Sequence, residues 1–111
     1  MATVAIILFV IAAVFGLIVL LSVLKTKPTP KTAVILHGLF AVSGLLLLVI
    51  FSASTIGPVP TASLIFFILA GLLGIILLVN DLATKKVPKF WAVVHPILAA
   101  AGLFLLIVFV V

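Results

Sequence analysis

Two histidines are the residues of this chain best suited to chemistry. The sequence has no cysteine and a single acidic residue, Asp81, so thiolate chemistry and paired carboxylates are excluded. His37 and His95 each lie inside a long apolar stretch, where an ionisable side chain is by default a functional hypothesis. An imidazole there can ligate a metal, carry a proton or form a hydrogen bond across helices. Which of these applies depends on the elements that hold the two rings.

The residues around each histidine follow the same spacing. A small residue stands four positions on, a glycine seven positions on and a leucine eleven positions on, so all four share one helix face. We expect this small face to leave a shallow slot of about two turns beside each imidazole, widened by Gly16 and Gly74 on the preceding helices. The two sets are His37, Ala41, Gly44 and Leu48, and His95, Ala99, Gly102 and Leu106.

The matched spacing belongs to an internal repeat. Residues 1–53 and 59–111 align without a gap, and 19 of the 53 aligned positions are identical. The alignment pairs the two histidines with each other and Lys31 with Lys89. We therefore predict two copies of one helical hairpin, related by an axis along the membrane normal. In an up-down bundle of these hairpins the second and fourth helices are diagonal, so the histidines should face each other at equal depth.

The composition predicts a membrane protein. Of the 111 residues, 68% are hydrophobic and 6% are charged, far from the balance of a soluble domain. Four continuous apolar stretches are long enough to cross the bilayer as helices, and each linker between them contains proline. We expect one all-α transmembrane domain, a four-helix up-down bundle over residues 1–111. The predicted spans are Thr3–Leu24, Thr32–Ala53, Thr61–Asn80 and Lys89–Val111.

The lysines predict the orientation. All six lie in or beside the first and third linkers, and neither terminus nor the second linker carries one. The positive-inside rule therefore places these two linkers in the cytoplasm and both termini outside the inner, or cell, membrane. Because the lysines form no extended basic face, the net charge of +5 does not indicate nucleic acid as a partner. The lipid bilayer is the expected partner.

With one histidine and one glycine seven residues later in each hairpin, the chain resembles the bis-histidine four-helix b-type cytochromes of membranes. The resemblance covers the whole bundle and implies one haem b, whose iron takes a nitrogen from each imidazole, and electron transfer, often with a quinol. Small residues would let the porphyrin approach the backbone, and lysines would pair with its propionates. The expected cofactor-binding residues are His37 and His95 at the iron, Gly16, Gly44, Gly74 and Gly102 at the porphyrin, and Lys31 and Lys89 at the propionates.

Two other functions remain open. A non-catalytic structural or assembly protein would use the small faces to dock helices, with the histidines in interhelical hydrogen bonds. A small transporter is the other alternative, although the first span lacks the charged residue on which small multidrug-resistance transporters rely. Zinc is less favoured, because its sites usually have three or four protein ligands. Asp81 is expected to form an interfacial salt bridge with a loop lysine, and a proton or quinol site is its alternative role. A quinol, a redox protein and a second copy of the chain stay open as partners.

Overall fold

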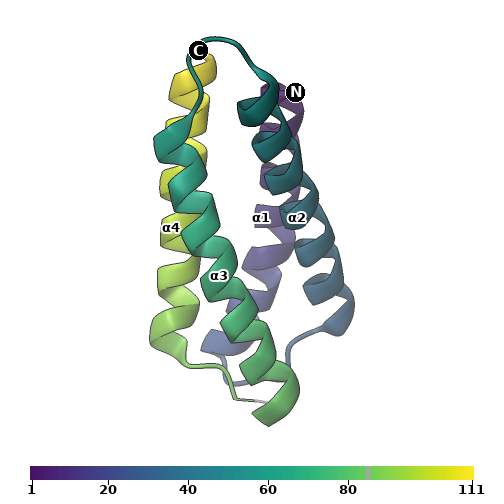
Figure 1. The fold of residues 1–111 in the computed structure, drawn as a ribbon. Coiled ribbons are helices and arrows are strands. Elements are labelled where there is room, and N and C mark those ends of the chain that lie inside the picture. The colour runs from purple at the N-terminus through teal and green to yellow at the C-terminus, as the bar shows by residue number, and fades with distance from the viewer. Residues whose placement is uncertain (85) are drawn as a thin grey trace.

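The computed structural model describes residues 1–84 and 86–111, which form four helices (Figure 1). Each helix is long and apolar enough to cross a membrane. The predicted all-α four-helix bundle is therefore confirmed. The helices are α1 (Ala2–Leu24), α2 (Lys31–Ser54), α3 (Thr61–Thr84) and α4 (Lys89–Val110).

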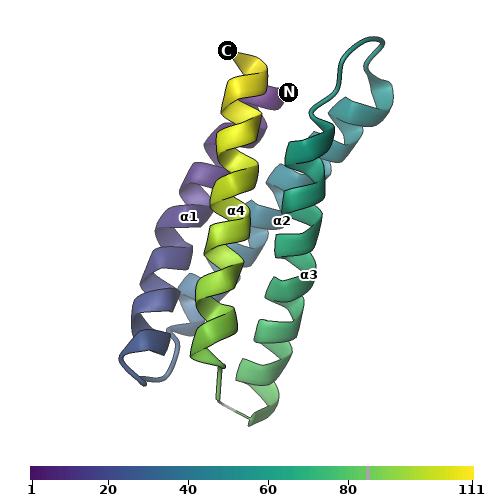
Figure 2. The ribbon, with the colours of Figure 1, turned by 90° about the vertical axis from the view of Figure 1, so that its left-hand side faces the viewer.

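The helices are arranged as an up-down square. α1 packs closely against α2, and α3 packs closely against α4. The two hairpins then meet along two seams, of which the α1/α4 seam is tighter and the α2/α3 seam looser. Figure 2 shows α1 and α4 side by side, and Figure 1 shows both termini at the same end of the bundle. The diagonal pairs are therefore α1 with α3 and α2 with α4, as the repeat predicted.

Local sequence explains most helix ends. α2 and α4 each begin directly after a proline in an extended conformation, Pro30 or Pro88, whose missing N–H is not needed there. α1 ends in a Schellman motif, in which Lys27 N–H donates to the Ser22 carbonyl and Thr26 N–H donates to the Val23 carbonyl. Thr26 adopts a φ of 54°, a left-handed conformation that glycine accepts far more easily than a β-branched residue.

One predicted boundary was wrong. α3 continues four residues past the predicted span Thr61–Asn80, whereas the other three helices agree with their predicted bounds to within one residue. Leu82 and Ala83 are good helix formers, and the next proline is Pro88, so nothing in this segment stops the helix at its polar residues. Asp81 therefore lies on the helix itself and not in the linker.

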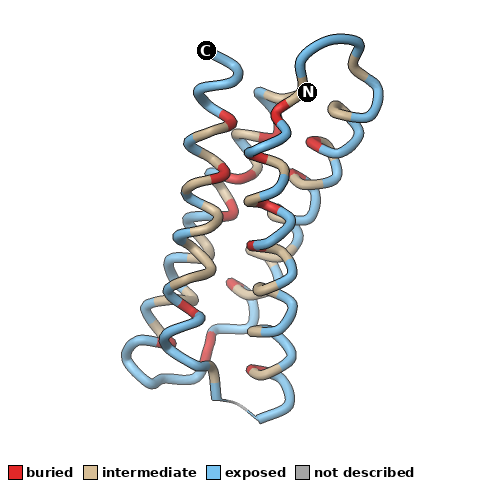
Figure 3. The backbone as a smooth tube through the Cα atoms, turned by 60° about the vertical axis from the view of Figure 1, so that its left-hand side comes forward, coloured by how far each residue is buried: buried red, intermediate tan, exposed pale blue. Residues whose placement is uncertain are grey.

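The core of the bundle is narrow, and the outer surface is apolar. Buried residues line the inward faces, while most outward-facing residues are exposed (Figure 3). The exposed residues include large apolar side chains on all four helices. Such a surface is unfavourable in water but matches the hydrocarbon of a bilayer, where helix association depends on close packing. The arrangement fits a multi-pass membrane protein.

An approximate two-fold axis runs along the bundle. Three residues contact their own counterparts in the other repeat, and a residue can do this only where it lies close to a two-fold axis. The predicted duplication is therefore visible in the packing of the bundle interior as well as in the sequence. The three pairs are Phe9–Phe67, with ring centroids 3.8 Å apart, His37–His95 at 5.9 Å, and Phe51–Phe109 at 6.4 Å.

Candidate functional site

The two imidazoles are held by matched hydrogen bonds to backbone carbonyls. His37 Nδ1 lies 2.8 Å from the carbonyl oxygen of Ala12 on α1. His95 Nδ1 lies 2.8 Å from the carbonyl oxygen of Ala70 on α3. Because a carbonyl oxygen only accepts, Nδ1 carries the proton in each neutral ring, and Nε2 keeps its lone pair. Each hairpin thus fixes the tautomer and position of its own histidine.

Glycines provide the space that the rings occupy. A Cβ atom at Gly16 would lie 2.9 Å from both Cε1 and Nδ1 of His37. A Cβ atom at Gly74 would lie 3.0 Å from Cε1 of His95. The separation at Gly16 is shorter than real Cβ contacts, so only glycine lets the His37 ring approach α1 this closely. Gly16 therefore lies at the same depth in the bundle as His37. The separation at Gly74 is tighter than most real contacts, so a side chain there would push the His95 ring away by a few tenths of an ångström.

The slot predicted above each histidine is filled by an aromatic ring. A Cβ at Gly44 would lie 3.0 Å from Phe9, and a Cβ at Gly102 would lie 3.2 Å from Phe67. The two phenylalanine rings stack on each other at the bundle centre, 3.8 Å apart and within 8° of parallel. The small faces were predicted correctly, but the expected open slot was wrong, because large side chains from α1 and α3 occupy it. The repeat did carry a signal, since the two phenylalanines are one of its identical pairs.

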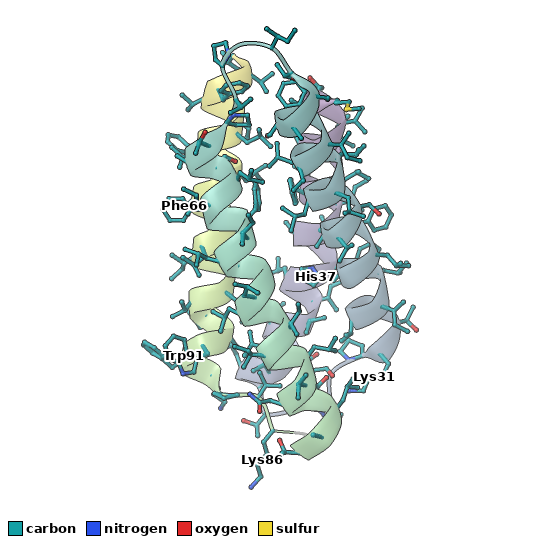
Figure 4. All side chains as sticks on the ribbon, viewed as in Figure 1. Lys31, His37, Phe66, Lys86 and Trp91 are labelled. Atoms are coloured by element: carbon teal, nitrogen blue, oxygen red, sulfur yellow. The ribbon has the colours of Figure 1, made fainter. Side chains whose placement is uncertain are left out.

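The imidazoles converge across the α2/α4 diagonal. Their ring centroids are 5.9 Å apart, and the ring planes are nearly perpendicular, at 84°. Both rings are half-buried, and within the described residues neither Nε2 has a protein hydrogen-bond partner. Figure 4 shows His37 pointing into the bundle, in the space between the α2 and α3 ribbons. Two imidazole rings, each with Nε2 outside these hydrogen bonds, therefore meet near the two-fold axis.

In the part of the chain that the structure describes, no third protein ligand joins this pair. Among residues 1–84 and 86–111, no group of three histidine or carboxylate side chains is placed to hold a metal ion. Asp81, the chain's one carboxylate side chain, is engaged elsewhere, as described below. A metal at the histidines would therefore take its remaining ligands from outside the protein.

A second polar cluster lies at the lysine-bearing end of the bundle. Asp81 Oδ2 accepts hydrogen bonds from Thr29 Oγ1 at 2.6 Å and from Lys31 Nζ at 2.9 Å. Lys31 Nζ also donates to Thr29 Oγ1 at 2.8 Å. The predicted salt bridge between Asp81 and a lysine of the linkers is confirmed, and the structure places that lysine, Lys31, at the first residue of α2. The cluster joins the two hairpins across the looser α2/α3 seam.

This cluster breaks the symmetry of the repeat. The counterpart of Asp81 is Val23, so Lys89, the counterpart of Lys31, cannot form the same ion pair. Lys89 is exposed at the start of α4. Both lysines begin their helices six residues before the histidines, a rise of about 9 Å. Lys85, which was grouped with the lysines of the third linker, lies outside the described residues.

Comparison with known proteins adds no relative. No protein-family model, no curated protein and no solved structure matches the chain.

Proposed function

We propose that this protein is a membrane-embedded b-type haem protein for electron transfer, with one haem iron ligated by His37 and His95. The observation that carries the proposal is the convergence of two imidazoles, each with Nδ1 bound to a backbone carbonyl and Nε2 free. Metal-ligating histidines usually donate their second ring N–H in this way, which fixes the tautomer and raises the basicity of the ligating nitrogen.

His37 and His95 would together hold one haem iron between their rings. Bonds from a metal to imidazole nitrogen are about 2.0–2.1 Å long, so two opposed ligands have nitrogens about 4 Å apart and ring centres about 6 Å apart. The observed centroid separation of 5.9 Å matches this spacing. A protein site with only two ligands also suits haem, because the porphyrin supplies the other four. When bound, the haem would supply a one-electron carrier.

The surrounding residues define what the chain itself would do. Phe9 and Phe67 close the bundle centre beyond the histidines and exclude water from that side. Gly16 and Gly74 leave room for the imidazoles beside α1 and α3. They would therefore position the histidines and would not contact the porphyrin. Gly44 and Gly102 would not contact the porphyrin while each packs against a phenylalanine ring. Phe9 and Phe67 occupy the slot expected for the porphyrin, so haem binding would require both rings to move out of the bundle centre.

The same proposal includes a direction of electron exchange. The histidines lie nearer the lysine-bearing end, which we expect to face the cytoplasm. Lys89 is exposed there, and Lys31 keeps a half-exposed ammonium, so both are available to an anionic propionate or an acidic partner surface. A quinol or a redox protein at that face would be the exchange partner, and a second copy of the chain remains open.

Absorption spectroscopy tests the proposal. Purified protein supplied with haem should give a sharp Soret band and split visible bands on reduction, as expected for two imidazole ligands. His37→Asn and His95→Asn should each lose this spectrum, because asparagine can still donate to the carbonyl but is a poor axial ligand. Lys89→Ala should weaken haem binding less than either histidine change, because the imidazoles would still hold the iron. Circular dichroism on every variant separates loss of haem from loss of fold.

Two results would overturn the haem assignment. One is wild-type protein that remains colourless after haem is supplied, and the other is unchanged haem binding in both asparagine variants. The histidines would then serve only to link neighbouring helices through their hydrogen bonds to the carbonyls, in a structural or assembly protein.

A further inference from the structure

The looser α2/α3 seam forms a groove on the outside of the bundle. Its volume is about 670 Å³, within the range of small-molecule sites. α2 contributes Val34, Gly38 and Val42, and α3 contributes Leu78 and Leu82. Most of these side chains are exposed in the bundle, so the groove opens toward lipid. An apolar chain is the kind of occupant that this lining fits.

The groove has the length of one membrane leaflet. Along α2 it extends from Lys31 to Ser43, twelve residues or about 18 Å of helix, and α3 lines it at Leu78 and Leu82. Half of the hydrocarbon core of a bilayer is about 15 Å thick. A single acyl chain that starts at the lysine-bearing end would therefore lie along the whole groove and end near the bilayer midplane.

The polar end of the groove presents a positive charge. The Lys31 side chain is 55% exposed, and two of its three ammonium hydrogens are used by Asp81 and Thr29. One N–H therefore remains for an external acceptor. Lys27 and Lys86 are exposed at the same end, and only Asp81 offsets this charge. Figure 4 shows Lys31 and Lys86 at this end of the bundle. The surroundings favour an anionic headgroup over a neutral one.

The seam on the opposite side of the bundle is packed differently. The symmetry-related α1/α4 seam is packed more tightly, and its counterpart of Gly38 is Pro96. At Gly38 an added Cβ would meet nothing within 4 Å, so the space beside it is open. The repeat thus supplies an internal reference, since Lys89 has the same helix position as Lys31 but begins a helix of the tighter α1/α4 seam.

We propose that the α2/α3 groove binds one anionic phospholipid, with its phosphate at Lys31 and an acyl chain along Val34, Gly38 and Val42. The groove does not involve His37 or His95, but it shares Lys31 with the proposed propionate contact, so a bound lipid would leave Lys89 to pair with a propionate. The lipid site would make the bundle responsive to the lipid composition of the leaflet at the lysine-bearing end.

Native mass spectrometry of the full chain, released from nanodiscs of equal parts phosphatidylglycerol and phosphatidylcholine, tests the proposal. Wild-type protein should retain one phosphatidylglycerol in preference to phosphatidylcholine. Lys31→Gln should lower that preference about fivefold, the effect expected for one lysine near a charged headgroup, whereas Lys89→Gln should leave it unchanged. Gly38→Phe should fill the groove and abolish retention of either lipid.

A second groove-filling variant and a competition with free phosphate complete the test. Val42→Phe fills the groove from a second position, so the test survives if Gly38→Phe fails to fold by circular dichroism. Inorganic phosphate at millimolar concentration should not displace the lipid, because it lacks the acyl chain. Equal retention of the two lipids, or equal effects of Lys31→Gln and Lys89→Gln, would overturn the proposal. So would undiminished retention in a folded groove-filled variant.

Discussion

Replacing Gly16 with alanine tests the contact that positions His37. The new Cβ would lie 2.9 Å from Cε1 and Nδ1 of the imidazole, whereas ordinary contact begins at 3.4 Å. The ring must therefore move away from α1, and its 2.8 Å hydrogen bond to the Ala12 carbonyl must lengthen or break. Gly38→Ala is the matched control, because its Cβ meets nothing within 4 Å.

The size of the effect follows from three terms. Overpacking at a tight site costs about 1–3 kcal/mol, and a hydrogen bond between membrane helices contributes about 0.6 kcal/mol. Alanine offsets about 1 kcal/mol through its better helix propensity. We expect Gly16→Ala to lower the free energy of unfolding by about 1–2 kcal/mol, and Gly38→Ala to raise it by up to about 1 kcal/mol. The difference in unfolding free energy between the two variants measures the contact with the His37 ring, since the gain in helix propensity is common to both.

Unfolding in mixed micelles by sodium dodecyl sulfate, followed by circular dichroism, measures these values. A double-mutant cycle with His37→Ala sharpens the result, because the penalty of Gly16→Ala should disappear once the ring is absent. The reasoning is refuted if Gly16→Ala and Gly38→Ala have the same effect, or if the penalty persists in the His37→Ala background.

Four further outcomes are expected. Topology reporters should read outside at the C-terminus and cytoplasmic in the first linker, and the reverse pattern would contradict the lysine asymmetry. Thr26→Gly should stabilise the bundle by about 1 kcal/mol in the same unfolding assay, because glycine accepts the left-handed conformation, and a loss of stability would contradict this. Asp81→Asn should destabilise it by up to about 1 kcal/mol, with the loss reduced at high salt, because its half-exposed partner Lys31 is partly screened. Ser63→Ala should cost about 0.6 kcal/mol by removing its 2.7 Å bond to the Gly102 carbonyl, and no measurable change would argue against that bond.

Much of the architecture could be read from the residues alone. Long continuous apolar stretches and prolines in the linkers predicted four helices, because a backbone in hydrocarbon must satisfy its own hydrogen bonds. The repeat predicted that His37 and His95 face each other from diagonal helices, and the structure places them 5.9 Å apart. Asp81 shows the limit of this reasoning. Its salt bridge was predicted, but its place on α3 was not, because a polar residue near an interface does not by itself end a helix.

The sequence by itself determined the helix count, the two-fold register and the pair of histidines, since these depend on apolar length and on spacing along one chain. Only the tertiary structure decided that Phe9 and Phe67 fill the predicted slot, that carbonyls of the neighbouring helix hold both Nδ1 atoms, and that one seam stays open. The physical reason is that these helices are apolar on all sides, so no amphipathic pattern fixes their rotation. Their rotation and the widths of the seams depend on side chains from several helices packing together at once.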